Sequence, residues 1–214
     1  MPSGAPTMVM PGTMPTSGMM PGAGAPNVAV AQGSARLNGA ALADALRAGR
    51  YVIVVRHGAT DNARPDAAMV NLADCGTQRP LSAAGIAQAK QVEQAVSALR
   101  LPIGEVRYSP YCRTRTTAQL EFGTTGQPDQ DLVAADYHGV RRVTQDAAVL
   151  TLINTVPRAG TDTVLVTHQN TIQNATGIPS PPEGGTQIYR PQPAGRPLLI
   201  AELGPADWTT LTPH

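Results

Sequence analysis

Short apolar runs, separated by longer amphipathic segments, set the hydrophobic pattern of the chain. Residues 51–55 and 163–167 are almost wholly apolar and rich in β-branched side chains, and polar residues bound both runs. This pattern is typical of strands buried on both faces of a parallel sheet. Residues 103–108 predict a third strand, and two later candidates lie at 187–190 and 198–202.

Helical periodicity fills the intervals between these strands. The expected helices cover residues 38–47, 82–99 and 140–156, with two shorter ones after Pro110 and after Asn170. This alternation of strands and helices predicts an α/β fold, a three-layer α/β/α sandwich around a mostly parallel central sheet.

Local signals place the ends of two of these helices. Gly49 is a natural stop for the first helix, and Ser82 is expected to cap the second. Residues 58–80 and 123–135 show no clear period and are expected to be loops. One face of the second helix is expected to carry its apolar side chains: Ile86, Ala89, Val92, Val96 and Leu99.

The first 35 residues differ in composition from the rest of the chain. They contain six proline and six glycine residues and six of the seven methionines, and the first charged residue is Arg36. Such a stretch has little to bury, so we predict a disordered tail or linker over 1–35 and a single domain over 36–214. The tail lacks the positive start and continuous apolar stretch of a secretory signal. The alternative is a stalk between a lost leader and an exported domain.

Composition narrows the class of partner. The net charge is +1, with Lys90 the sole lysine, and no apolar run approaches the length of about 20 residues that a membrane span needs. We therefore expect neither a nucleic-acid partner nor a membrane span. With only 3% aromatic residues, the core is expected to be built from alanine, valine, leucine and isoleucine.

The candidate chemistry lies at the ends of the predicted strands. His57 and His168 each follow an apolar run, Arg56 precedes His57, and Arg113 follows the strand at 103–108. Because parallel α/β sheets bind ligands beyond the carboxyl ends of their strands, these side chains are expected to meet in one pocket. Histidines and arginines without a carboxylate cluster suit a phosphate group better than a metal ion.

The same residues resemble those of a known family. The segment Arg56-His57-Gly58-Ala59-Thr60 resembles the RHG signature of the histidine phosphatase superfamily, which includes phosphoglycerate mutases and acid phosphatases. The second sequence block of this superfamily resembles Ser109, Arg113, Thr117 and Ala118 of this chain. The third block resembles Val164 through His168. Residues 81–85 resemble the Leu-Ser-x-x-Gly sequence with which a helix of the superfamily starts. The resemblance covers roughly residues 50–190 and is nearest to small bacterial members. It implies a phosphoglycerate mutase-like fold.

The resemblance also implies roles for individual residues. His57 would be phosphorylated during turnover, while Arg56, Arg113 and His168 hold the phosphoryl group. Further candidates for contact with the substrate are Gly58, Thr60 and Asn170, although Asn170 is better explained as a helix cap. Arg79 and Arg115 lie near the implied pocket, with Arg115 expected on a solvated helix face.

The proton donor departs from the family pattern. Branches of the superfamily use a glutamate after the second block or an aspartate directly after the second histidine, whereas here Gln169 follows His168. Asp136 is the leading candidate because it follows an apolar triplet, and Asp61 and Glu183 stay open. A substrate with a good leaving group tolerates a weak acid.

Cysteine usage leaves two alternatives open. Cys75 and Cys112 both lie in loop segments near the expected site. They either form a bridge across its rim in an oxidising compartment or stay as two reduced thiols. The resemblance leans towards an exported or periplasmic protein rather than a cytoplasmic one, although no leader is visible.

The sequence therefore predicts a phosphatase that hydrolyses a small phosphorylated substrate, a phosphomonoester, through a phosphohistidine on His57, without a metal or other cofactor. One alternative is a non-catalytic phosphate-binding or interaction domain of the same fold. Another is a metallohydrolase using His57, His168 and Asp61, which lacks any of the usual ligand spacings. The sequence names neither the physiological substrate nor the oligomeric state.

Overall fold

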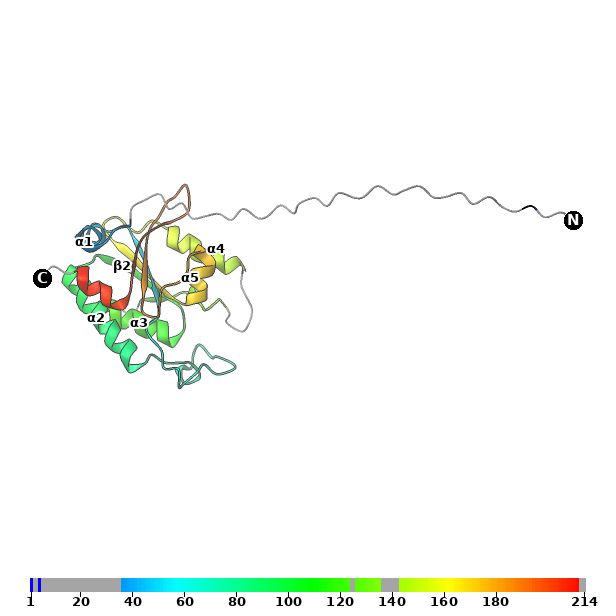
Figure 1. Cartoon of the computed structure of the whole chain (residues 1–214). Helices are drawn as coiled ribbons and strands as arrows, with labels where there is room; N and C mark the ends of the chain where they lie inside the picture. The colour runs from blue at the N-terminus through cyan, green and yellow to red at the C-terminus, as the bar shows by residue number, and fades with distance from the viewer. Residues whose placement is uncertain (2–3, 5–35, 124–125, 136–142, 212–214) are drawn as a thin grey trace.

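A computed structural model describes residues 1, 4, 36–123, 126–135 and 143–211. Almost all of the predicted tail, 1–35, lies outside the described residues. The described chain forms a six-stranded sheet in the order β3-β2-β4-β1-β5-β6, with helices on both faces (Figure 1). The predicted α/β/α sandwich is confirmed.

The sheet is parallel through most of its width. The strands β1 (Val52–Arg56), β4 (Asp162–Thr167), β2 (Ile103–Tyr108) and β3 (Gln127–Pro128) pair in parallel. Beyond β1, the strands β5 (Thr186–Arg190) and β6 (Leu198–Leu203) pair antiparallel. The carboxyl ends of β1, β2 and β4 therefore meet at one edge of the sheet, where ligands bind in such folds.

Alternating side chains of β1 pack into two separate hydrophobic cores, one on each face of the sheet. Ile53 and Val55 point to a core shared with α1 (Gly39–Ala48), α2 (Ala83–Leu99) and α3 (Cys112–Phe122). Val52 and Val54 point to the opposite core, which is completed by α4 (Val143–Asn154) and α5 (Gln169–Thr176). Since β1 is covered on both faces, its sequence is a continuous apolar run rather than an alternating one.

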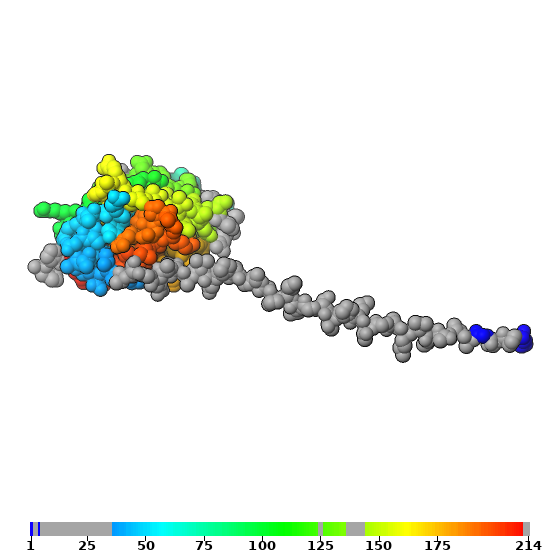
Figure 2. All heavy atoms as spheres, turned by 90° about the horizontal axis from the view of Figure 1, so that it is seen from above, coloured from blue at the N-terminus to red at the C-terminus, as the bar shows by residue number. Residues whose placement is uncertain are grey.

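The ends of the described domain lie side by side. In Figure 2, residues near 200, coloured orange, adjoin the blue segment that contains α1, and the Leu37 amide donates to the Ile200 carbonyl at 2.8 Å. The last 3₁₀ segment, η4 (Pro205–Leu211), packs on α2 and buries Trp208 completely. Trp208 and the equally buried Tyr189 correct the expectation of a purely aliphatic core. A low aromatic content does not determine where the few aromatic residues lie, and these two lie in the hydrophobic core.

The start of α2 follows the sequence prediction except at one position. The Ser82 side chain caps the helix by accepting a hydrogen bond from the Gly85 amide at 3.0 Å. However, Ile86, expected on the apolar face, is 36% exposed. The helix instead turns Gly85 inward, where an added Cβ would lie 2.1 Å from the Ala59 carbonyl oxygen. A backbone approach this close is invisible to hydrophobic periodicity.

The segment expected to be an inserted loop at 123–135 contains regular structure. It holds β3, at the edge of the sheet, and the 3₁₀ turn η2 (Gln130–Leu132). Leu132 and Val133 are fully buried, and their carbonyls accept hydrogen bonds from Thr167 and Thr171. Side chains from other elements fix this segment, so its own sequence shows no period.

Replacing Asp162 by asparagine should remove a pH dependence of stability. The side chain is fully buried; Oδ1 accepts the Tyr51 amide at 2.8 Å, whereas Oδ2 has no partner among the residues that the structure describes. Burial raises the pKa of Asp162 to about 7, although the Tyr51 hydrogen bond opposes the rise. The folded state thus binds more protons than the unfolded state between about pH 4 and pH 7, so stability falls as pH rises through this window. The loss is about 4 kcal/mol in order of magnitude.

Urea unfolding of both proteins at pH 4.5 and pH 7.5 measures this effect. The free energy of unfolding of Asp162→Asn, taken relative to that of the wild type, should increase from pH 4.5 to pH 7.5. The exposed Asp44→Asn substitution is the matched control and should show no such gain. Parallel stability profiles of wild type and Asp162→Asn would contradict the prediction.

Candidate active site

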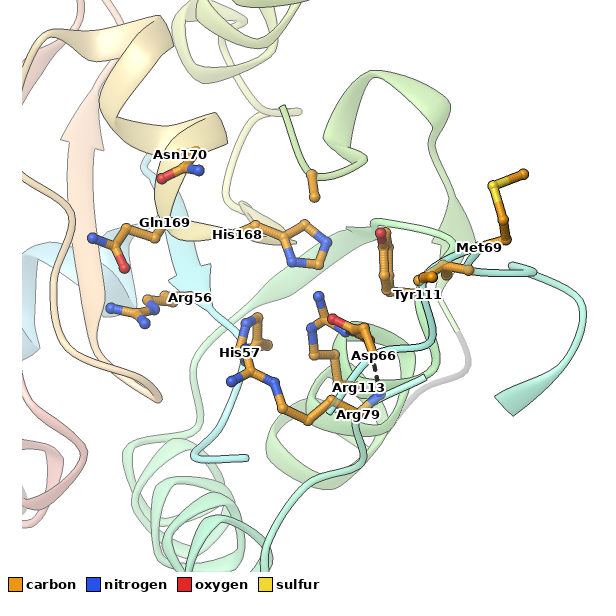
Figure 3. Close-up of a pocket in the computed structure, with 13 residues that line it drawn as sticks. Arg56, His57, Asp66, Met69, Arg79, Tyr111, Arg113, His168, Gln169 and Asn170 are labelled. Atoms are coloured by element: carbon orange, nitrogen blue, oxygen red, sulfur yellow. Dashed lines mark hydrogen bonds and ion pairs between the residues drawn. The ribbon is translucent and has the colours of Figure 1, made fainter. Parts of the chain in front are cut away.

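A cavity of about 440 Å³ opens at the carboxyl ends of β1, β2 and β4 (Figure 3). Its floor is formed by Arg56, His57, Arg113 and His168, the four residues that the sequence analysis expected to meet. The loop between β1 and α2 forms a wall with Asp66, Ala68, Met69, Val70 and Arg79. The remaining lining residues are Tyr111, Ala134, Gln169 and Asn170.

His57 is held rigidly just beyond β1. Its amide donates to the Thr167 carbonyl at 3.1 Å, and its Nδ1 lies 2.9 Å from the Gly58 carbonyl oxygen. Since a carbonyl only accepts, Nδ1 carries the proton and Nε2 carries a free electron pair. Burial, followed by the charge of Arg113, lowers the pKa of His57 to about 4. His57 is therefore a neutral imidazole with Nε2 available as a nucleophile.

His168 occupies the N-cap position of α5 and faces His57. The two ring centroids lie 5.4 Å apart, and the Tyr111 ring contacts His168 at 4.7 Å. Nε2 of His168 lies 2.8 Å from Ser109 Oγ. Burial, then the neighbouring His57 and Arg113, lowers the pKa of His168 well below its usual value. The ring is neutral in the unliganded pocket, and a bound anion would favour its protonation.

Two arginines supply fixed positive charge. Arg113, at the start of α3, is 5% exposed; its Nη1 pairs with Asp66 at 3.0 Å and its guanidinium lies over the Tyr111 ring. Arg56 donates from Nη1 to the Pro181 carbonyl at 3.1 Å, and its Nη2 lies 3.8 Å from Glu183. Burial lowers the pKa of both arginines, but a guanidinium keeps its charge in proteins.

Three buried nitrogen atoms of this cluster have no hydrogen-bond partner among the described residues. Within the described part of the chain, no hydrogen bond reaches Arg56 Nε, Arg113 Nε or His168 Nδ1. Because buried polar atoms in proteins nearly always have a hydrogen-bond partner, a cluster of unpaired nitrogen atoms indicates a binding site for a hydrogen-bond acceptor. A tetrahedral oxyanion offers several acceptor oxygens and negative charge in one small group.

Other predicted residues lie around this centre in different ways. Gly58 donates its amide to Thr117 Oγ1, and Thr60 bonds Glu183 through both its amide and its hydroxyl; neither Gly58 nor Thr60 lines the cavity. Asn170 lines it, but the expected capping role is wrong, because the backbone of His168 starts α5 and Asn170 is already helical.

The predicted acids differ in their surroundings. Asp136 lies outside the described residues. The Asp61 carboxylate accepts the Ala63 amide within its own turn and does not line the cavity. Burial acts to raise the pKa of Glu183, but the two hydrogen bonds from Thr60, followed by the positive charge of Arg56, outweigh it and leave this pKa lowered. Glu183 is thus held as a carboxylate.

Asp66 is a site residue that the sequence analysis missed. Its Oδ1 accepts the Arg79 amide at 2.7 Å as well as the Arg113 side chain. The loop at 58–80 has no clear period, and nothing in its sequence distinguishes Asp66 from the other aspartates there. Arg79, named from its position, does line the cavity.

A disulfide joins Cys75 to Cys112, the residue before Arg113. The Cys112 amide also donates to Gln78 Oε1 at 2.7 Å, and Nε2 of Gln78 donates to the Asn71 carbonyl. Arg115 is exposed and lies 3.4 Å from the Cys75 sulfur. The loop wall is therefore fastened to the start of α3 beside Arg113.

The described residues show neither a metal-binding cluster nor a membrane-spanning helix. There, no three or more histidine, cysteine, aspartate or glutamate side chains cluster in a way that would hold a metal ion. No helix there has the length and apolar character to cross a membrane.

Comparisons with known proteins add a family and a fold. Residues 52–146 match the model of the histidine phosphatase superfamily, branch 1. No curated protein matches the chain in sequence.

Among solved structures, the protein histidine phosphatase SixA complexed with tungstate superposes with a TM-score of 0.55 at 16% identity, covering 73% of this chain and 98% of that one. The open reading frame Rv3214 from Mycobacterium tuberculosis gives a TM-score of 0.50 at 18% identity, covering 71% and 96%. The putative phosphohistidine phosphatase SixA from Nakamurella multipartitia gives 0.50 at 18% identity, covering 73% and 96%. The segment 52–146 therefore resembles branch 1 of the histidine phosphatase superfamily in sequence, and the described domain shares the fold of these solved structures.

Proposed function

We propose that the domain over residues 36–214 is a phosphatase that hydrolyses a phosphomonoester through a phosphohistidine on His57. The observation that carries the proposal is the state of His57: Nδ1 is tied to the Gly58 carbonyl, so Nε2 faces a pocket with two arginines and a second histidine. Buried donors around a neutral nucleophile suit transfer of a phosphoryl group, whose negative charge needs fixed positive partners.

The reaction has two steps. The electron pair of His57 Nε2 attacks phosphorus, an N–P bond forms, and the P–O bond to the leaving group breaks with its electrons on that oxygen, which takes up a proton. A water then attacks phosphorus, the N–P bond breaks with its electrons returning to Nε2, and inorganic phosphate leaves. Arg56, Arg113 and His168 hold the phosphoryl oxygens in both steps.

The source of the leaving-group proton limits the range of substrates. We propose Asp136 as the donor on sequence grounds, since Glu183 is held as a carboxylate and Asp66 is paired with Arg113. Leaving groups that need little protonation would be processed fastest. Phosphohistidine, named for the SixA structure from Nakamurella multipartitia, is a further substrate to test: an N–P bond rather than a P–O bond would break, and its electrons would leave on an imidazole nitrogen that needs little protonation.

Mass spectrometry of the trapped intermediate tests the nucleophile. Wild-type enzyme mixed with p-nitrophenyl phosphate and denatured at alkaline pH should gain the mass of one phosphoryl group on the peptide that contains His57. The His57→Ala variant should gain none. The labelling should be the same with and without EDTA; turnover that EDTA abolishes, without any labelling of His57, would instead support the metal-dependent alternative.

A second candidate is a phosphate-binding domain without turnover. It is favoured by the absence, among the described residues, of an unpaired carboxylate lining the cavity. This domain would bind inorganic phosphate but would show neither labelling of His57 nor product release. The same experiment therefore separates the two candidates.

A further inference from the structure

Ser109 forms the polar contact behind His168. The residue directly follows β2 and is fully buried. Its amide donates to the Val166 carbonyl at 2.9 Å, and its carbonyl accepts from the Thr114 hydroxyl at 2.6 Å. The backbone is thus fixed, and the side-chain oxygen is held 2.8 Å from His168 Nε2.

The direction of this hydrogen bond decides what His168 presents to the pocket. A neutral imidazole carries one N–H, on either Nδ1 or Nε2. One ring nitrogen of His168 points towards His57 and Arg113 in Figure 3, and because Nε2 is bonded to Ser109, this nitrogen is Nδ1. It is buried and has no partner among the described residues. A proton there would donate to a phosphate oxygen, whereas a free electron pair would repel it.

The surroundings of the Ser109 hydroxyl favour one direction. Its other polar neighbour within the described residues is the Tyr111 amide, at 3.5 Å, which can only donate. Among the contacts of the described residues, the hydroxyl proton therefore has one acceptor, the electron pair of His168 Nε2. When Ser109 donates, the single proton of the neutral ring lies on Nδ1.

We infer that Ser109 is a positioning residue that acts through His168: its hydroxyl donates to Nε2 and so places the N–H of His168 on Nδ1, facing the anion. The inference concerns binding in the pocket proposed above and rests on the proposed function only for its kinetic consequence. A hydroxyl can also rotate and accept. When a bound phosphate dianion favours the imidazolium, Ser109 accepts from Nε2 while Nδ1 still donates to phosphate. A carboxylate at this position could not serve both states, because it would keep the ring charged.

Nitrogen NMR of the unliganded protein tests the tautomer directly. In protein labelled with ¹⁵N-histidine, two-bond ¹H–¹⁵N spectra distinguish Nδ1–H from Nε2–H, and the His168→Gln variant assigns the signal. Wild type should show the Nδ1–H tautomer at His168, and Ser109→Ala should show a mixture or the Nε2–H form. A wild-type ring in the Nε2–H form would overturn the inference, whatever the activity of the protein.

Binding of inorganic phosphate and p-nitrophenyl phosphate kinetics measure the consequence. Ser109→Ala should weaken phosphate binding by about 10-fold and lower kcat/KM by about 10- to 100-fold, because a hydrogen-bonded orientation in the pocket is lost. Ser97→Ala, on the exposed face of α2, is the matched control and should change neither value. In a His168→Ala background, Ser109→Ala should have no further effect.

The outcomes separate this inference from the proposed function. Thermal melting first establishes that both proteins are folded. Equal phosphate affinity in wild type and Ser109→Ala would then contradict the inference, even if His57 becomes phosphorylated. Conversely, the expected tautomer and the expected loss of phosphate affinity without any labelling of His57 would support the inference and defeat the phosphatase proposal.

Discussion

Replacing His57 by alanine is expected to lower the rate of p-nitrophenyl phosphate hydrolysis by about 10³-fold or more. The substitution removes the attacking nitrogen itself, and the other pocket residues then only orient substrate for a slow attack by water. The good leaving group of this substrate reduces the need for a general acid, so the measured loss reports on the nucleophile. Steady-state kinetics in excess substrate give the comparison.

The loss should fall on kcat/KM and kcat while the pocket still binds an anion. Alanine leaves Arg56, Arg113 and His168 in place, so inorganic phosphate should bind the variant to within about 10-fold of wild type. The melting temperature should also be near that of wild type. A variant that hydrolyses p-nitrophenyl phosphate at the wild-type rate would show that His57 is not the nucleophile.

Replacing Gly85 by alanine is expected to destabilise the fold by about 3 kcal/mol. Helix propensity alone predicts the opposite, since alanine is favoured over glycine inside a helix by about 1 kcal/mol. In the structure, however, the new Cβ would lie 2.1 Å from the Ala59 carbonyl oxygen and 2.9 Å from its amide nitrogen. Such overpacking against backbone costs about 1–3 kcal/mol or more, because neither segment can move freely. The sign of the change therefore distinguishes close packing from propensity.

Urea unfolding of the two proteins measures this difference. Gly195→Ala is the matched control: its Cβ would meet nothing within 4 Å, so the change should lie within about 0.5 kcal/mol. Ala59 is two residues from His57, so any folded Gly85→Ala protein should also lose activity through displacement of His57. Increased stability in the variant would rule out the close approach of α2 to the segment after β1.

Much of the fold could be predicted from the sequence because its signals are local. The runs at 51–55 and 163–167 are almost wholly apolar, which is typical of strands covered on both faces. Ser82 precedes a periodic helix and caps it as expected. The elements that the local pattern did not predict depend on contacts between residues far apart in the chain. Thr167 and Thr171 fix the segment of β3 and η2 by hydrogen bonds, and Trp208 is buried against α2.

Part of the candidate site could likewise be predicted from the sequence, whereas the rest depends on the tertiary structure. The sequence by itself determined which strands end in His57 and His168 and that a parallel sheet brings those ends together, because strand direction and burial follow from the pattern of apolar residues. The tertiary structure alone decided the pairing of Asp66 with Arg113, the Gly58 carbonyl that leaves Nε2 of His57 free, and the Ser109 contact behind His168. These depend on distances of about 3 Å between residues far apart in the chain or on local backbone orientation, and no spacing of residue types encodes such distances.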